Sequence, residues 1–469
     1  MPCSLNALYF KNGRIPRAAQ AMASMARFKY PLFALAVLSL SSPAGATDLL
    51  EIYHAAQQQD ALFNAARAAR RAGQEKLAQG RALLLPTINL TANTTYNKNN
   101  IEYRGATPFS GGSSSYNSNG YAVNLVQPLF RQQNWLAYSE SELQVAQTEA
   151  QFKIAEQELI LRVAQAYFDV LLAQDSVQLA ATQKSAISEQ LEQAKRNFEV
   201  GSATITDTLE AQARADLISS QEIAAQSNLE IKKNALQQLT NTMPGSLRAR
   251  GVQFKPETPQ PMDIEKWVAD AQLGNLQVRV AQVSAELAEK EVARNRGGHY
   301  PTIDLVANYA ENSASGGSFG VGSDSRNSSI GVQLNLPLFQ GGATQSKWRE
   351  ATANRDRAQS ELDNVRRTVA VQTRQAYLGA VNGIAQVQAL QQALKSGESL
   401  RDASKLGQEV GVRTNLDVLN AHQQLYATRR DLSQAEYNYL LSHLQLKAAS
   451  GMLEEADLVK VNQALYSSQ

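Results

Sequence analysis

The sequence is poor in several residue types that define common protein classes. Its single cysteine, Cys3, excludes a disulfide framework and cysteine-based metal sites. Aromatic residues make up only 7%, and none of the 13 prolines lies within 131–199 or 340–409, which favours long helices over several small globular domains. Beyond residue 46 no run of about 18 apolar residues occurs, so no transmembrane helix is predicted.

The first 46 residues differ from the rest. The segment from Met25 to Ala46, "MARFKYPLFALAVLSLSSPAGA", has the basic start, apolar run and small-residue ending of a secretory signal. We therefore expect residues 1–24 to be an over-long start, with initiation at Met22 or Met25, and the mature chain to begin at Thr47.

The signal also carries the excess of positive charge. The five charged side chains of residues 1–46 are all basic, so without this segment 40 of the 45 Lys and Arg residues remain against 43 Asp and Glu, and the net charge changes from +2 to about −3. No clustered basic face with interleaved aromatic residues remains, so nucleic acid is not an expected partner.

The remaining chain consists of two similar halves. Residues 48–86 align without a gap with 263–301, "VNLVQPLF" at 123–130 matches "VQLNLPLF" at 332–339, and "EVGSATITDTLEAQAR" at 199–214 matches "EVGVRTNLDVLNAHQQ" at 409–424. Each half reads as helix, strand, loop, strand, long helix, tight turn and helix. The expected divisions are a first repeat 47–241 (strands about 86–96 and 120–130, helical hairpin 131–241), an insert 242–262, a second repeat 263–450 (strands about 301–310 and 329–339, helical hairpin 340–450) and a C-terminal tail 451–469.

The expected strands alternate between apolar and polar residues. Ile88 and Leu90 fall on one face and Asn89 and Thr91 on the other. This pattern is typical of transmembrane barrel strands, although a soluble sandwich strand shows it too. The uncharged polar face and the Gly/Ser-rich loops favour the barrel. Four strands cannot close a barrel, and an open edge in lipid leaves backbone groups unpaired, so the barrel must be shared between copies: two would give eight strands and three would give twelve.

The helices predict a long tube. Each long helix, 131–199 and 340–409, would extend roughly 100 Å at 1.5 Å per residue. The shorter helices, 48–84 with 205–241 and 263–297 with 415–450, would match one long helix when placed end to end. The insert 242–262 is then expected to form a collar midway along the tube.

The repeated turn contains capping residues in both copies. Gly201 and Gly411 suit the left-handed residue after a helix end. Thr204 with Asp207, and Thr414 with Asp417, have the spacing of a capping box for the next helix. Capping does not explain Arg413, which stands opposite Ala203.

The signal, the two halves, the "LPTINL" and "YPTIDL" strand openings, the "QPLF" and "LPLF" closings and the paired turns together resemble the TolC family of outer-membrane efflux and secretion channels. The resemblance covers 47 to about 455. It implies a mainly α fold with β structure, in which a homotrimer forms a twelve-stranded β-barrel in outer-membrane lipid, continued by a periplasmic α-helical barrel. Its expected partners are a periplasmic adaptor protein and an inner-membrane ABC or proton-driven transporter. Because no cysteine follows residue 46, the resemblance is to the unlipidated type I secretion branch.

The resemblance also implies roles for the turn residues. Arg413 matches an arginine that helps hold the periplasmic entrance closed by pairing with the aspartate that Asp207 matches. Asp417 matches a ring of carboxylates at the narrowest point, which would favour cations. Gln408 stands where the family's best-known member has a latch tyrosine, and Asn420 where it has a second aspartate.

No enzyme constellation is found. The four histidines, His54, His299, His422 and His443, have no metal-ligand spacing, and no catalytic motif or cofactor site is present. The expected function is a passive, gated exit duct for proteins or small toxic compounds. The alternatives are a passive outer-membrane porin and an exported coiled-coil scaffold without a pore.

Overall fold

The computed structural model describes residues 47–466 apart from 107, 109–110, 249–254 and 318–320. The expected export signal and the middle of the insert 242–262 lie outside these residues. The elements are α1 (Leu49–Gln59), α2 (Ala61–Ala82), β1 (Thr87–Ile101), β2 (Gly112–Phe130), α3 (Gln132–Glu199), α4 (Ile205–Thr240), α5 (Ile264–Gly274), α6 (Leu276–Arg296), the short 3₁₀ helix η1 (Gly297–His299), β3 (Thr302–Ala314), β4 (Ser323–Asn335), α7 (Ala343–Glu409), α8 (Asn415–Ala449) and α9 (Glu455–Tyr466). Within the described part of the chain, every helix is too short or too polar to cross a membrane.

The two shorter entering helices are each divided, which corrects the prediction of single helices over 48–84 and 263–297. Asp60 and Asn275 adopt extended backbone conformations and cap the helix that follows. The Asp60 carboxylate accepts a hydrogen bond from the Phe63 backbone N–H at 2.6 Å, and the Asn275 side chain accepts one from Gln277 at 2.8 Å. A good N-cap inside a helical pattern thus begins a new helix. The tail 451–469, for which no element was predicted, contains α9.

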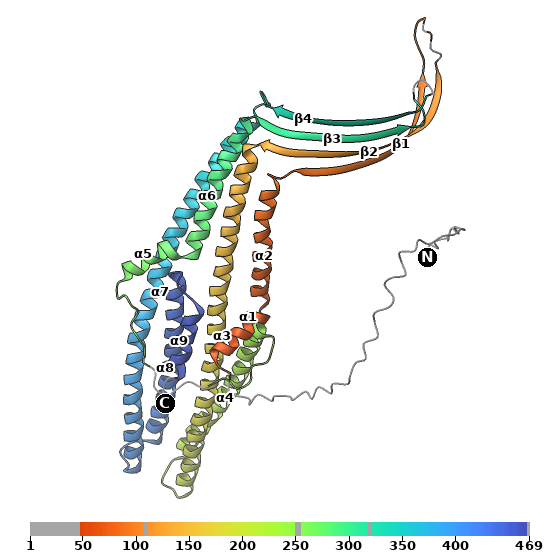
Figure 1. Cartoon of the computed structure of the whole chain (residues 1–469). Coiled ribbons are helices and arrows are strands. Elements are labelled where there is room, and N and C mark those ends of the chain that lie inside the picture. Colours follow the sequence, from red (N-terminus) through yellow and green to blue (C-terminus); the bar gives the residue numbers. More distant parts are fainter. Residues whose placement is uncertain (1–46, 107, 109–110, 249–254, 318–320, 467–469) are drawn as a thin grey trace, which may run out of the picture. The chain divides into compact units, whose positions relative to one another are not determined.

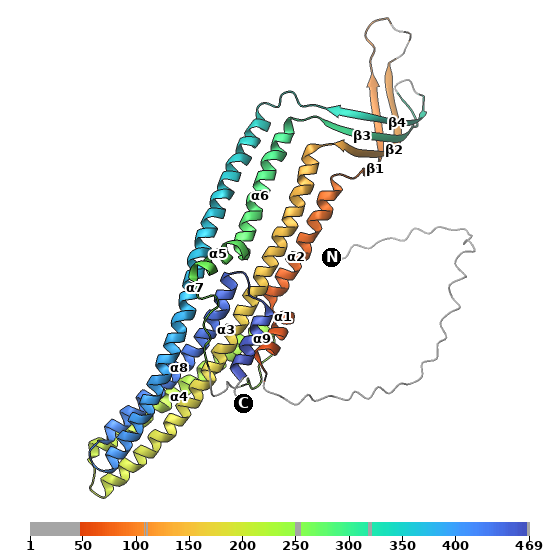
Figure 2. The same ribbon diagram turned by 60° about the vertical axis from the view of Figure 1, so that its left-hand side comes forward.

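Each long helix is flanked by two shorter ones, as the helix lengths predicted. In the first half α3 packs against α2 and then α4, and in the second half α7 packs against α6 and then α8 (Figure 1). Ion pairs join the neighbours: Arg70 of α2 lies 2.9 Å from Glu149 of α3, and Lys184 of α3 lies 2.7 Å from Glu222 of α4. The α3–α4 and α7–α8 turns lie at the end of the helices away from the strands (Figure 2).

The main core lies where α1 and α9 pack on the middle of α3. It contains Leu159, Val163 and Tyr167 of α3, which are fully buried, together with residues of α1, α4, α8 and α9. The Tyr167 and Tyr466 hydroxyls are 2.5 Å apart, so the buried ring of α3 has a polar partner on α9. Tyr167 is therefore a residue that packs α3 against its neighbouring helices.

The strands form one antiparallel sheet in the order β1-β2-β3-β4. The register places Leu90, Val123 and Tyr309 in one row, and Asn89, Asn124 and Asn308 in the next. Successive rows point to opposite faces, so the predicted division into an apolar and a polar face is confirmed. The strands extend further toward the loops than predicted, and β4 ends at Asn335 rather than 339.

The sheet has open edges and a fixed connection to the helices. Among the described residues β1 and β4 each pair on one side only. On the apolar face of the sheet, the side chain of Ile330 is 77% exposed in the single chain. Where β2 joins α3, Arg131 donates two hydrogen bonds to the nearly buried Asp304 of β3, at 2.7 and 2.6 Å. This bidentate pair ties the base of the sheet to the start of the long helix.

Candidate functional site: the two helical-hairpin turns

Both hairpin turns have the same backbone construction. Gly201 and Gly411 adopt φ values of +77° and +78°, which favour glycine. Thr204 and Thr414 then cap α4 and α8, and each forms a reciprocal capping box with the aspartate three residues later. The repeated residues are therefore sufficient to build two tight turns at the same end of the helices.

The carboxylates of the two turns are held in the same way. Asp207 accepts hydrogen bonds from the Thr204 backbone N–H at 2.9 Å and hydroxyl at 2.8 Å, and Asp417 accepts the matching pair from Thr414, both at 2.9 Å. The hydrogen bonds from Thr414, together with the charge of Arg413, lower the pKa of Asp417 below its ordinary value. Asp417 is therefore an anion at neutral pH.

Arg413 is the charge that distinguishes the two turns. Its Nη1 lies 3.8 Å from Oδ1 of Asp417 in its own turn, and its stem packs over Gly407. Among the described residues of one chain it makes no hydrogen bond or ion pair with Asp207, the partner that the resemblance implies.

The other two site residues also have partners within the chain. Gln408 donates a hydrogen bond to the Asn415 side chain at 3.3 Å, which links the end of α7 to the start of α8. Asn420 is exposed on α8 one turn beyond Asp417. Its side-chain oxygen accepts a hydrogen bond from Arg214 of α4 at 3.1 Å.

Arg214 was missed by sequence reasoning. A second hydrogen bond joins it to the side chain of Gln423 on α8, so it connects the two hairpins near their turns. The repeat alignment contained a signal for it, because Arg214 stands opposite Gln424. It is thus a further position, besides Arg413, at which the two turn segments differ in charge.

The turns also present apolar side chains to solvent. Val200 and Val412 are each 77% exposed, and Val410 is 66% exposed. Exposed valines at the tip of each hairpin are an unusual surface for a helix end that contacts only water, and grouped apolar residues of this kind mark interaction sites.

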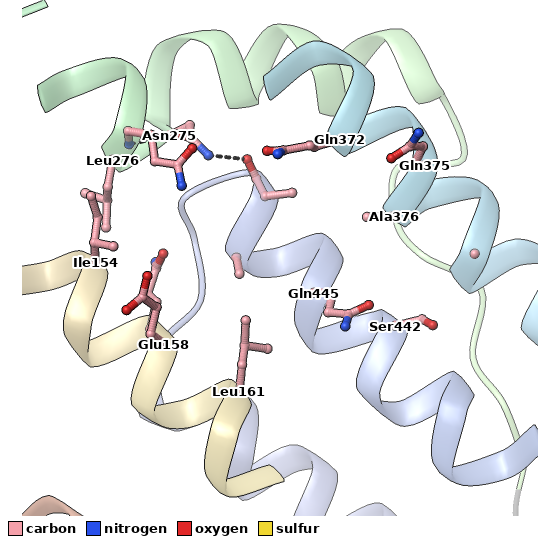
Figure 3. Close-up of a pocket in the computed structure, with 15 residues that line it drawn as sticks. Ile154, Glu158, Leu161, Asn275, Leu276, Gln372, Gln375, Ala376, Ser442 and Gln445 are labelled. Atoms are coloured by element: carbon pink, nitrogen blue, oxygen red, sulfur yellow. Dashed lines mark hydrogen bonds between the residues drawn. The ribbon is translucent and has the colours of Figure 1, made fainter. Parts of the chain in front are cut away.

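A pocket lies far from the turns, where α8 ends and α6 begins. It has a volume of about 420 Å³ and is lined by α3, α6, α7 and α8, with Gln372, Gln375 and Gln445 among its polar side chains (Figure 3). The side chain of Asn275, at the start of α6, donates a hydrogen bond to the carbonyl of Ala449, at the end of α8, at 2.8 Å. The pocket therefore marks the place where one short helix replaces another beside the long helices.

The fold agrees with comparisons to known proteins. Residues 52–242 and 267–452 match the family described as outer membrane efflux protein. The chain belongs to this family. The two matched segments together span most of the described chain and follow its two halves.

Individual relatives extend over nearly the whole chain. The outer membrane protein TolC of Vibrio cholerae is 35% identical, with 93% of this chain and 98% of that protein covered. The alkaline protease secretion protein AprF of Pseudomonas aeruginosa is 32% identical, with 93% and 91% covered. Among solved structures, the outer membrane protein VceC of Vibrio cholerae has a TM-score of 0.73 at 20% identity, covering 86% of this chain and 96% of its own, and the CmeC outer membrane channel of Campylobacter jejuni has 0.75 at 19%, covering 88% and 89%.

These findings define what the chain is and where it acts. It is a TolC-family outer-membrane channel protein with a periplasmic extension. It serves as an exit duct in efflux or secretion.

Proposed function

We propose that three copies of the chain form one gated channel, with a twelve-stranded barrel in outer-membrane lipid and a helical tunnel in the periplasm. The open edges of β1 and β4 support this assembly, because edge strands in lipid need a partner for their backbone groups. The polar row Asn89, Asn124 and Asn308 would then line the interior, and the exposed apolar row would face lipid.

The helical surfaces support the same assembly. On α4, exposed apolar side chains include Leu209, Leu217 and Ile231, and on α7 they include Leu378 and Leu406. Within the described part of one chain these side chains are between 51% and 61% exposed. Contact between α4 of one copy and α7 of the next would bury both and close the tunnel wall.

The tunnel would be the outer part of a three-component pump, and it would not be an enzyme. We place a periplasmic adaptor protein at the hairpin tips, where Val200, Val410 and Val412 are exposed, and an inner-membrane ABC or proton-driven transporter beyond it. Relatives are named for protease secretion as well as for efflux, which supports export of proteins, small toxic compounds or both.

The two turns would form the gate of the tunnel. Six turns would meet around the axis, with Arg413 of one copy near Asp207 of a neighbour and the Asp417 side chains in a ring. Gln408 and Asn420, in place of a tyrosine and an aspartate, would make the closed state weaker and the ring less acidic. Exposed ion pairs are individually weak, which suits a gate that must open reversibly.

Single-channel recording tests the gate. Purified protein carrying Arg413→Ser should show a higher conductance in planar bilayers than the wild type. Arg430→Ser is the matched control, because Arg430 lies on α8 away from the turn and donates a hydrogen bond to its neighbour Asp431 at 2.9 Å. An unchanged conductance for Arg413→Ser would remove the latch role of this residue.

The rival functions differ in assembly. Cross-linking of outer-membrane fractions should give a heat-modifiable species of three subunits. A conducting monomer would favour the passive porin, and a periplasmic monomer that forms no conductance would favour the scaffold.

A further inference from the structure

Besides the main core, an apolar contact closer to the turns joins hairpin α7–α8 to hairpin α3–α4. Leu419 of α8 is 2% exposed and packs with Ile187 of α3 and Ile218 of α4. The next residue, Asn420, points out of this contact and is exposed. The polar surface beside Leu419 is therefore formed where α8 meets α4.

Arg214 covers this contact from the α4 side. It lies one helical turn before Ile218, and its guanidinium donates hydrogen bonds to the side-chain oxygens of Asn420, at 3.1 Å, and Gln423. Both acceptors are on α8, so one side chain bridges the two hairpins of a single chain. The bridge fixes the position of the guanidinium as well as the spacing of the helices.

The charge of this guanidinium is not neutralised by its partners. Asn420 and Gln423 are uncharged amides, and within the described residues of the chain Arg214 has no ion pair with a carboxylate. Arginine keeps its proton at all physiological pH values. A fixed positive charge therefore stands at the level of Asn420.

The positive charge of Arg214 lies near the proposed constriction, the ring of Asp417 side chains. Asp417 and Asn420 are three residues apart on α8, so their side chains are neighbours on one helix face. The Asp417 carboxylate is bonded to Thr414 and the Arg214 guanidinium to Asn420, so the two charges lie between one and two helical turns apart along α8. With three copies around an axis, each negative charge of the ring would have a positive charge beside it.

We infer that Arg214 is a selectivity-determining residue of the channel entrance, which joins the hairpins and offsets the cation preference of the Asp417 ring. The inference rests on the proposed gate. It assigns to α4 a role in ion selectivity that sequence reasoning gave only to α8. The contact also gives Asn420 a role: its amide oxygen accepts a hydrogen bond from the Arg214 guanidinium and leaves the positive charge in place.

Reversal potentials measured across a KCl gradient, with the purified full-length protein in planar bilayers, test this role. Arg214→Gln should raise the permeability ratio of K⁺ to Cl⁻ by roughly twofold or more at low salt, because removing one of the positive charges near a carboxylate ring strengthens the preference of the ring for cations. The change should shrink at about 1 M salt, where charges are screened within a few ångströms. Arg214→Lys keeps the charge and should stay close to the wild-type ratio.

The neighbouring amide gives a second measurement. Asn420→Asp should raise the ratio less in the presence of Arg214 than in the Arg214→Gln background, because the new carboxylate would pair with the guanidinium. Lys184→Gln is the matched control: it removes one positive charge from an ion pair within hairpin α3–α4, at Glu222, and should leave the ratio unchanged.

The outcomes separate this inference from the proposed function. A wild-type protein without conductance contradicts the channel itself. If the wild type conducts, two results overturn the role of Arg214. One is a K⁺/Cl⁻ permeability ratio of Arg214→Gln that equals the ratio of Lys184→Gln. The other is an effect of Asn420→Asp that has the same size with and without Arg214. If Arg214→Gln does not assemble into the heat-modifiable trimer, Asn420→Asp is tested alone. A rise of its K⁺/Cl⁻ permeability ratio above about tenfold over the wild type would refute compensation by Arg214.

Discussion

Replacing Asp60 should destabilise the periplasmic part of the protein more than any exposed charge would. Asp60 ends α1, caps α2 and accepts two hydrogen bonds from Arg162 of α3, at 2.9 and 3.1 Å. Its side chain is 4% exposed and that of Arg162 is 34% exposed. One carboxylate therefore satisfies a helix terminus and a partly buried arginine at once.

The expected magnitude follows from these two functions. Loss of an N-cap costs about 1 kcal/mol. Removal of one partner from a buried ion pair costs roughly 3–5 kcal/mol, and the exposure of Arg162 places this pair below that range, at about 2 kcal/mol. Asp60→Ala should therefore lose about 3 kcal/mol in total, whereas Asp60→Asn keeps a capping oxygen and should lose about 2 kcal/mol.

Thermal unfolding in detergent, followed by circular dichroism, is the assay. For a chain of this length each kcal/mol shifts the midpoint by about 1 °C, so Asp60→Ala should unfold about 3 °C lower than the wild type. Asp431→Ala, which breaks an exposed pair with Arg430, is the control and should shift the midpoint by under about 1 °C. Equal shifts for the two variants would refute the reasoning.

The pH dependence gives an independent check on Asp60. Burial alone would raise the pKa of this carboxyl, but the hydrogen bonds from Arg162 and Phe63 and the charge of Arg162 hold it below its ordinary value of 3.8. A lowered pKa stabilises the folded state above pH 3.8, and this contribution is lost as the pH falls further. Asp60→Asn should remove that part of the acid sensitivity.

Two further predictions concern a buried histidine and a turn. Burial and the nearby Lys447 lower the pKa of His443, so the unfolded chain binds this proton more readily and the unfolding midpoint should fall as the pH drops below about 6.5; His443→Gln should flatten that dependence, and an unchanged profile would contradict it. Gly411→Ala should cost about 1–2 kcal/mol by placing a Cβ at positive φ in otherwise open space. Gly245→Ala, also in open space but without positive φ, should unfold like the wild type, and equal midpoints for the two glycine variants would disprove the strain.

The sequence by itself determined the features that repeat at short range. Alternation at period two predicted the two faces of the sheet, because successive strand residues must point to opposite sides. The matching halves predicted two hairpins, and the absence of proline predicted helices as long as α3 and α7. The capping residues at 204, 207, 414 and 417 belong to the same group, since a capping box is contained within four residues.

The same local logic could have divided the shorter helices. Asp60 and Asn275 are good N-cap residues, but they lie inside apolar patterns that continue on both sides. Read by periodicity alone, each pattern predicts one helix. Asp60 caps the new helix through Phe63 and also bonds Arg162, about a hundred residues away, which periodicity does not reveal.

Only the tertiary structure decided which distant side chains meet. Arg131 bonds Asp304 and Arg214 bonds Asn420, and these partners are 173 and 206 residues apart in the sequence. These contacts depend on the rotation of one element against another. Over the length of α7 or α3 a small change in helical twist would move a side chain to another face, so the residue pattern alone could not fix them. The sequence thus specified the turns and the strands, and the packing of the two hairpins decided which charges stand together at their ends.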